Sequence, residues 1–174
     1  QHYKKINDNV GVPIIIYNIP SRSVIDMSVD TMSKLFELKN IVGVKDATGD
    51  LNRVDQQLNA MGKEFIQLTG NDDNAFEFNK RGGVGAIGVT ANVAAKLSSD
   101  FQKACVNNID KALELDKLLQ PLHTSLFIES NPSPVKYAAS LLGMCEPSVR
   151  LPLVEITEET KKKVSAALKV AKLL

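Results

Sequence analysis

The sequence predicts an α/β fold in which four strands and four helices alternate along the chain and further helices follow. Three observations support this fold class. Short apolar runs rich in β-branched residues recur at intervals of roughly twenty to thirty residues, as in the βαβ units of a parallel sheet. Segments with a helical spacing of apolar residues separate these runs. Later in the chain of 174 residues the alternation stops without a low-complexity linker, so we expect one structural unit.

The predicted strands are short and are bounded by turn-forming residues. The first contains VPIIIY, the second ends in a lysine, and none carries a charge before its last residue. Such runs are typical of strands that are buried on both faces of a parallel sheet. The strands are predicted at residues 12–17, 41–45, 65–69 and 84–89.

One helix follows each predicted strand. Ser28 is a candidate N-cap for the first helix, with Asp30 and Thr31 in its first turn. These helices are predicted at residues 27–38, 50–61, 72–80 and 93–106, and three more at 110–127, 134–142 and 158–173. We therefore expect the β/α part to span residues 1–106 and a helical extension, packed on it, to span residues 107–174.

The composition excludes several classes of function. The formal net charge is +1 and 24% of the residues are charged, so a nucleic-acid partner is not expected. No apolar run is long enough to span a membrane, and the polar N-terminus has no secretory signal. Cys105 and Cys145 lack metal-ligand spacing, so we expect reduced core thiols in helices of a cytoplasmic protein, with neither a disulfide nor a zinc site.

Four parallel β/α units are compatible with two architectures. An open doubly wound sheet binds its ligand at a switch point, whereas half of an eight-stranded barrel has its site at the carboxyl ends of the strands. Gly83, Gly85 and Gly88 match the G-x-G-x-x-G pattern of dinucleotide-binding loops. These glycines precede the fourth predicted strand or lie within it and are not at a helix N-terminus, so a nucleotide-binding protein is the least favoured hypothesis.

Chemically useful residues lie at the ends of the predicted strands. Tyr17 ends the first strand and Arg22 follows it, Lys45 ends the second, Gly70 follows the third, and Ile87 lies in the fourth. Each has an ordinary explanation by itself, because a lysine, arginine or tyrosine at a strand end usually reaches into water. Since the carboxyl ends of parallel strands share one mouth, we expect these residues to converge.

The combination indicates carbonyl chemistry. Desolvation at a barrel mouth and a neighbouring arginine both disfavour the charged form of a lysine, and a neutral amine can attack a carbonyl to form a Schiff base. A tyrosine hydroxyl can shuttle the protons of that reaction, and an arginine can bind a carboxylate through two parallel hydrogen bonds. We hypothesise that Lys45 is a nucleophile, Tyr17 a proton relay and Arg22 a carboxylate clamp.

Five segments occur in order over the whole chain. They are residues 17–22 (YNIPSR), 43–49 (GVKDATG), 82–85 (GGVG), 89–93 (VTANV) and 131–136 (NPSPVK). Together they closely resemble the dihydrodipicolinate synthase family, a branch of the class I pyruvate aldolase and N-acetylneuraminate lyase superfamily. The resemblance implies a (β/α)8 TIM barrel, with its second half at residues 1–106 and C-terminal helices at residues 107–174.

The resemblance also implies a role for each strand-end residue. Lys45 corresponds to the lysine that forms a Schiff base with pyruvate, and Tyr17 to the tyrosine that shuttles protons. Arg22 corresponds to the arginine that receives the carboxylate of L-aspartate 4-semialdehyde, and Gly70 and Ile87 correspond to residues that line the pyruvate pocket. The implied product is 4-hydroxy-tetrahydrodipicolinate, in lysine and diaminopimelate biosynthesis. The resemblance implies no cofactor and no metal, and it implies a cytoplasmic homotetramer.

The chain departs from the family pattern at two places and leaves alternatives open. Asn71 stands where many members have aspartate, and Ser130 where many have proline. The family's glycine- and threonine-rich pyruvate segment and its second relay tyrosine have no counterpart here, so we expect activity to need the N-terminal half. The alternatives are a sialate or 2-keto-3-deoxy sugar acid lyase, which would lack an arginine at position 22, and a non-catalytic half-barrel that acts as an assembly module.

Overall fold

The computed structural model describes residues 1–174 and consists of two compact units, Gln1–Ile87 and Gly88–Leu174. The first unit contains every strand, and the second contains the longest helices. The expected boundary after residue 106, between the barrel part and its helical extension, stays a prediction.

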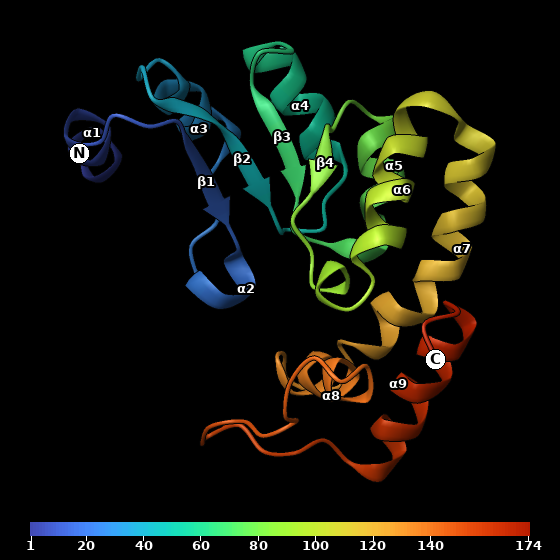
Figure 1. Ribbon diagram of the computed structural model, residues 1–174. Helices are drawn as coiled ribbons and strands as arrows, with labels where there is room; N and C mark the ends of the chain where they lie inside the picture. The colour runs from blue at the N-terminus through green and yellow to red at the C-terminus, as the bar shows by residue number, and fades with distance from the viewer. The chain divides into compact units, whose positions relative to one another are not determined.

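The first unit is built on a parallel sheet with the strand order β1-β2-β3-β4, so consecutive strands are neighbours. The strands are β1 (Ile14–Asn18), β2 (Ile41–Asp46), β3 (Ile66–Thr69) and β4 (Gly85–Ala86). All of the predicted strands are therefore present, and β1 and β4 form the edges of the sheet (Figure 1). β4 is shorter than predicted because only Gly85 and Ala86 pair with β3.

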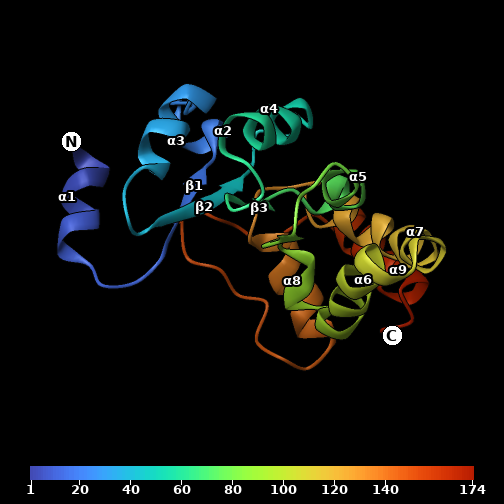
Figure 2. The same ribbon diagram turned by 90° about the horizontal axis from the view of Figure 1, so that it is seen from above.

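Helices connect the strands of the first unit, as a parallel arrangement requires. They are α1 (His2–Asn9), α2 (Pro20–Ser23), α3 (Val29–Phe36), α4 (Asn52–Met61), the 3₁₀ turn η1 (Asp72–Asn74) and α5 (Ala75–Lys80). α3 begins where the sequence predicts, because the Ser28 hydroxyl oxygen accepts a hydrogen bond of 3.2 Å from the Thr31 backbone N–H. α3 and α4 lie side by side on one face of the sheet (Figures 1 and 2).

The hydrophobic core of the first unit lies between that face and the two helices. Met32, Val44 and Phe65 are buried together, and Phe36 packs edge-on against Phe65 with 5.1 Å between the ring centroids. Burying one large apolar side chain contributes about 1.5–3 kcal/mol, so this packing holds α3 and α4 on the sheet.

The opposite face of the sheet is open. Ile15, Gly43 and Ile66 form a row across β1, β2 and β3 on this face, and the two isoleucines are 39% and 36% exposed. A Cβ atom on Gly43 would lie only 2.1 Å from the Ile66 carbonyl oxygen. β2 therefore needs glycine here for β3 to come close.

Gly43→Ala is expected to lower the free energy of unfolding by about 1–3 kcal/mol or more, because the added methyl group overlaps the backbone of β3. Urea unfolding followed by circular dichroism measures the effect. Gly11→Ala is the matched control, since no heavy atom lies within 4 Å of the position of its Cβ. An unchanged urea midpoint for Gly43→Ala would contradict the close approach of the two strands.

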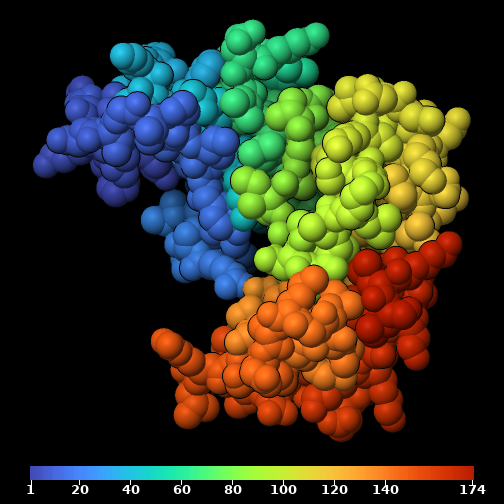
Figure 3. Space-filling view, viewed as in Figure 1, coloured from blue at the N-terminus to red at the C-terminus, as the bar shows by residue number.

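The second unit is helical. Its elements are the 3₁₀ turn η2 (Thr90–Asn92) and the helices α6 (Ala95–Asn107), α7 (Ile109–Ser125), α8 (Ser133–Leu141) and α9 (Glu158–Val170). α6 and α7 lie side by side, in yellow-green and yellow in Figure 3. Leu119, Leu122 and Leu168 are almost fully buried in the core of this unit. The helices predicted after residue 92 are all present, and none combines the length and apolar character needed to cross a membrane.

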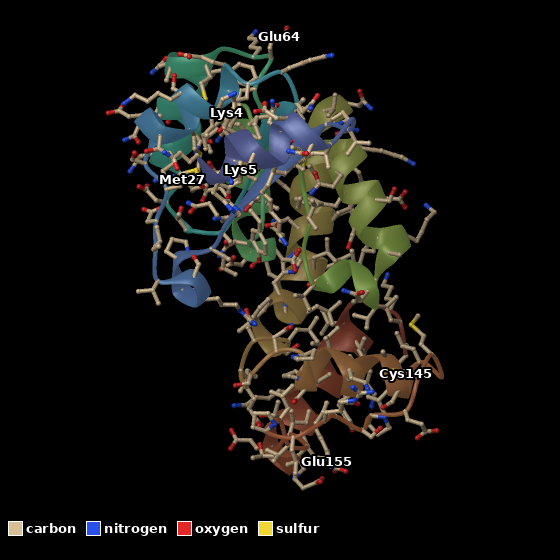
Figure 4. The ribbon with its side chains drawn as sticks, turned by 90° about the vertical axis from the view of Figure 1, so that its left-hand side faces the viewer. Lys4, Lys5, Met27, Glu64, Cys145 and Glu155 are labelled. Carbon is tan, nitrogen blue, oxygen red and sulfur yellow. The ribbon has the colours of Figure 1, made fainter.

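The two cysteines differ from the expected pair of core thiols. Neither forms a disulfide, but only Cys105 lies in a helix, α6, where it is half-buried. Cys145 is exposed on the segment that follows α8 (Figure 4), so the prediction of a helical core position was wrong for this residue. α8 ends at Leu141, and Gly143 then takes a φ of 71°, which ends helical geometry before Cys145.

A hydrogen-bonded carboxylate joins the segment before α8 to the start of α9. Glu129 Oε1 accepts hydrogen bonds from the Thr157 backbone N–H at 3.0 Å and from the Thr157 hydroxyl at 2.8 Å. Thr157 in turn caps α9, because its hydroxyl oxygen accepts a bond of 3.3 Å from the Thr160 N–H. Hydrogen bonds from the Thr160 hydroxyl and then from Thr157 lower the pKa of Glu129 below its ordinary value.

Glu129→Gln is expected to reduce stability at neutral pH but not in acid. A carboxylate whose pKa is lowered by folding stabilises the folded state above its ordinary pKa, and this contribution is lost as the pH falls through the folded value. Urea midpoints of the wild type and the variant should therefore differ at neutral pH and converge as the pH falls through the lowered pKa of Glu129. Glu146→Gln, at an exposed glutamate of the same unit, should match the wild type throughout. A difference that persists in acid would exclude this explanation.

Candidate active site

The carboxyl ends of β1 and β2 bring two of the predicted site residues together. The strands pair so that Tyr17 lies opposite Lys45. Lys45 Nζ is 3.9 Å from the centroid of the Tyr17 ring, within the range of a cation–π contact. Lys45 is half-buried and Tyr17 is 49% exposed, so the amine and the ring are both accessible to a ligand.

Gly70 borders the Lys45 side chain from the end of β3. Its backbone N–H donates a hydrogen bond of 2.7 Å to the Asp46 carbonyl oxygen, which joins this position to β2. A Cβ atom on Gly70 would lie 3.1 Å from Lys45 Cε and 2.8 Å from Ala47 Cβ. Glycine therefore leaves room for the path of the lysine side chain.

The other two predicted residues, Ile87 and Arg22, make no contact with the Lys45 side chain that compares with those of Tyr17 and Gly70. The Ile87 N–H donates a hydrogen bond of 2.9 Å to the Thr69 carbonyl oxygen, which fixes Ile87 beside the end of β3, and its side chain is 49% exposed. Arg22 is exposed on the short helix α2, directly after β1. The Arg22 side chain makes no ion pair and no hydrogen bond with any other residue. The structure thus brings the lysine, the tyrosine and the glycine together and leaves the arginine on the neighbouring helix α2.

A buried ion pair, between Asp46 and Arg53, lies on the face of β2 opposite Lys45 and was not predicted from the sequence. Asp46 follows Lys45, so its side chain enters the helix-covered face of β2, where the residue is only 5% exposed. Arg53 of α4 donates from Nε to Asp46 Oδ2 at 2.9 Å. Thr48 donates to the other carboxylate oxygen from its N–H at 2.9 Å and from its hydroxyl at 2.6 Å. The alternation of side chains along β2 could have predicted this position, because the residue that follows Lys45 must point to the opposite, helix-covered face.

One acceptor near the strand ends has no partner. The Asn71 N–H donates a hydrogen bond of 3.0 Å to Thr69 Oγ1, which shapes the turn after β3. Asn71 Oδ1 is buried and makes no hydrogen bond. Because buried acceptors are normally paired, this oxygen is available to a donor on a bound molecule.

Together these features define a class of site. An amine lies beside a phenol at the carboxyl ends of parallel strands, and a glycine leaves space at its side. A lysine and a tyrosine placed in this way are the side chains that covalent chemistry on a carbonyl compound requires. The structure contains no group of three or more His, Cys, Asp or Glu side chains that could hold a metal ion.

Comparison with known proteins identifies the family. Residues 1–171 match the Dihydrodipicolinate synthetase family, and the chain belongs to this family. It is 71% identical over 178 residues to the 4-hydroxy-tetrahydrodipicolinate synthase of Pelagibacter ubique, covering 100% of this chain and 61% of the relative. It is 58% identical to the synthase of the same name from Methylobacterium radiotolerans, covering 99% of this chain and 58% of the relative. The chain spans about 60% of the length of the curated relatives it matches.

Solved structures agree with this assignment. The dihydrodipicolinate synthase of Acinetobacter baumannii, chloride-inhibited and complexed with pyruvate, matches with a TM-score of 0.95 and 39% identity, covering 100% of this chain and 60% of that one. The synthase of Thermotoga maritima matches with a TM-score of 0.93 and 36% identity, covering 100% of this chain and 61% of that one. The predicted fold class, parallel β/α units of a (β/α)8 barrel followed by helices, is confirmed.

Gly70→Ala is expected to move the Lys45 amine away from the Tyr17 ring, because the new methyl group would lie 3.1 Å from Lys45 Cε. Reductive methylation with isotope-labelled formaldehyde keeps the lysine charge and makes each amine visible by NMR. Methyl groups above an aromatic ring resonate upfield, so the Lys45 signal should be upfield in the wild type and move toward the other lysines in Gly70→Ala.

Two controls make this measurement decisive. The Lys45 signal is identified by its loss in Lys45→Arg. Gly11→Ala, which adds a methyl group in open space, should leave the signal unchanged. An identical Lys45 signal in Gly70→Ala and the wild type would show that Gly70 does not determine the position of the amine.

Proposed function

We propose that Lys45 is the Schiff-base nucleophile of a 4-hydroxy-tetrahydrodipicolinate synthase, and that this chain contributes parallel β/α units to the barrel of that enzyme. The observation that carries the proposal is the contact between Lys45 and Tyr17, 3.9 Å from amine nitrogen to ring centroid, on paired strand ends. The names of the relatives that are 71% and 58% identical support the reaction. The pyruvate complex of the Acinetobacter baumannii protein supports pyruvate as the first substrate.

The first step joins Lys45 to pyruvate. The neutral amine attacks the ketone carbon, a C–N bond forms, and the carbonyl oxygen takes a proton to give a carbinolamine. Loss of water then gives the imine, with Tyr17 supplying and removing the protons. Loss of a proton from the adjacent methyl group converts the imine into an enamine, whose terminal carbon is the nucleophile for the second substrate.

The second step joins the enamine to L-aspartate 4-semialdehyde. Arg22 binds the carboxylate of this substrate through two parallel hydrogen bonds. The enamine carbon attacks the aldehyde carbon, so a C–C bond forms and the aldehyde oxygen becomes a hydroxyl. The amine of the substrate then attacks the imine carbon, which closes the ring and releases Lys45. The product is 4-hydroxy-tetrahydrodipicolinate, and the balance is one water lost.

Gly70 and Ile87 complete the pocket around Lys45. Gly70 keeps space for the lysine side chain, and Ile87 lines the pyruvate pocket from the end of the sheet. No cofactor or metal is required by these steps. The open sheet face, with Ile15 at 39% and Ile66 at 36% exposure, supports activity within a closed barrel. Resemblance to the family supports a cytoplasmic homotetramer.

Borohydride trapping with pyruvate tests the proposal. Residues 1–174 replace the matching segment of the Pelagibacter ubique synthase, and the chimera is treated with pyruvate and sodium borohydride. Reduction of the imine should leave a carboxyethyl group on Lys45, which peptide mass spectrometry locates. Lys45→Ala should carry no adduct and lose roughly a thousandfold or more in turnover. Lys39→Ala, which removes an exposed lysine just before β2, is the matched control.

The same chimera separates the alternatives. No adduct, or an adduct on another lysine, would overturn the role of Lys45. Consumption of both pyruvate and aspartate semialdehyde is expected. Cleavage of a sialic acid or a 2-keto-3-deoxy sugar acid in place of this condensation would favour a lyase.

A further inference from the structure

The buried ion pair of Asp46 and Arg53 extends to the residues that follow α2, the helix that carries Arg22. Arg53 donates to the Asp46 carboxylate from Nε at 2.9 Å and to the Met27 carbonyl oxygen from Nη2 at 2.7 Å, and its Nη1 lies 3.5 Å from Asp26 Oδ2. Asp26 and Met27 belong to the segment between α2 and α3, where Figure 4 labels Met27. One guanidinium group therefore joins β2 to this segment.

Asn18 hydrogen-bonds the residues between α2 and α3 to the end of β1. Its Nδ2 donates to Asp26 Oδ1 at 2.9 Å, and its Oδ1 accepts a bond of 3.1 Å from the Met27 N–H. The Asn18 carbonyl oxygen also accepts a bond of 2.8 Å from the Ala47 N–H, directly beyond β2. Asn18 is 4% exposed and Arg53 is 8% exposed, so the Asp26 carboxylate, itself 52% exposed, is held by two buried side chains.

Arg22 lies in the longer segment of residues 19–28, which contains α2 and is held by Asn18 at its start and by the contacts of Asp26 and Met27 near its end. Its side chain is exposed, so its distance from Lys45 depends on where the backbone of the segment is held. Val24, two residues on, has a φ of 65°, which is unfavourable for a β-branched residue. Such a conformation costs about 1–3 kcal/mol and persists only where the surroundings hold it, which indicates that the segment is constrained.

We infer that Asp26 and Arg53 are positioning residues that set the distance between the carboxylate clamp Arg22 and the nucleophile Lys45. Through this distance they select an aldehyde whose carboxylate lies at a matching separation from its reacting carbon. The inference rests on the proposed function. The rate of a bond-forming step is sensitive to geometry, because a misplacement of the reacting groups by about 1 Å can lower the rate roughly a hundredfold.

A substitution at Asp26 can change the position of the segment with little effect on the stability of the fold. Its side chain is 52% exposed, and an exposed ion pair contributes little to the stability of a fold. Asp26→Ala removes the acceptor of Asn18 and a partner of Arg53 while it leaves the buried pair of Arg53 and Asp46 intact. The variant should therefore fold and yet hold the segment less firmly.

The experiment uses Asp26→Ala in the chimera that carries residues 1–174. The KM for aspartate semialdehyde should rise about tenfold, while the KM for pyruvate and the adduct on Lys45 stay within about twofold of the wild type. The preference for aspartate semialdehyde over 3-aminopropanal, which lacks the carboxylate, should fall by about the same factor. A merely structural role would not produce this division between the two substrates.

Asp55→Ala is the matched control. Asp55 is 53% exposed, against 52% for Asp26, and it also pairs with an arginine, since its Oδ2 lies 3.1 Å from Arg81 Nη1. This pair does not involve the segment 19–28, so both KM values should be unchanged. Arg53→Lys keeps the charge, but one ammonium cannot replace the guanidinium fork, so it should change the aldehyde KM in the same direction as Asp26→Ala.

Hydrogen exchange of residues 19–28 adds a measurement that does not depend on turnover. Exchange should be faster in Asp26→Ala and Arg53→Lys than in Asp55→Ala. Equal exchange in Asp26→Ala and Asp55→Ala would overturn the inference, and so would an unchanged aldehyde KM in a variant that still forms the adduct. A wild-type chimera without any adduct would instead overturn the proposed function, and this inference with it.

Discussion

The alternation of side chains along β2 is the constraint on which the candidate site depends. Because successive residues point to opposite faces, Lys45 reaches the open face beside Tyr17, and Asp46 enters the covered face and pairs with Arg53. The parallel register extends both rows to β1, where Asn18 lies opposite Asp46. One register therefore places Lys45 and the ion pair of Asp46 and Arg53 at the same strand end. A shift by one residue would exchange them and place the amine among the packed helices.

The ionic group on the covered face is better suited to directing the backbone than to adding stability. A buried ion pair often gains little over an apolar replacement, because desolvation offsets the Coulomb attraction. Asp46, at 5% exposure, takes hydrogen bonds from Arg53 and Thr48, so its charge is fully paired. Each N–H of a guanidinium needs its own acceptor in a fixed direction. Such a group can therefore hold several loops in one relative position, which a site assembled from several strand ends requires.

The strands and the longer helices could be predicted from the sequence because each depends on a local pattern, as the Ser28 cap shows, whereas the short helix α2 was not predicted. The contact of Lys45 with Tyr17 followed from a general property of parallel strands. The roles proposed for these residues rest on several family-like segments taken together. The partnership of Arg53 with Asp26 had no such signal, because it depends on which face of a helix meets a distant loop. Cys145 was misplaced because its apolar neighbours suggested a helix that in fact ends earlier.

The open face of the sheet leaves the surroundings of Lys45 accessible to water, which matters for the proposed imine. Water hydrolyses an imine, so a Schiff-base site must exclude water while the second substrate reacts. Tyr17 is 49% exposed, and Ile15 and Ile66 on the same face are 39% and 36% exposed. In a closed barrel, side chains on this face pack in layers that fill the interior. The same apolar side chains can therefore bind further strands and keep water from the imine. The alignment of the Lys45 amine with the Tyr17 ring is a property of the first unit by itself, whereas the lifetime of the proposed covalent intermediate would depend on what covers this face.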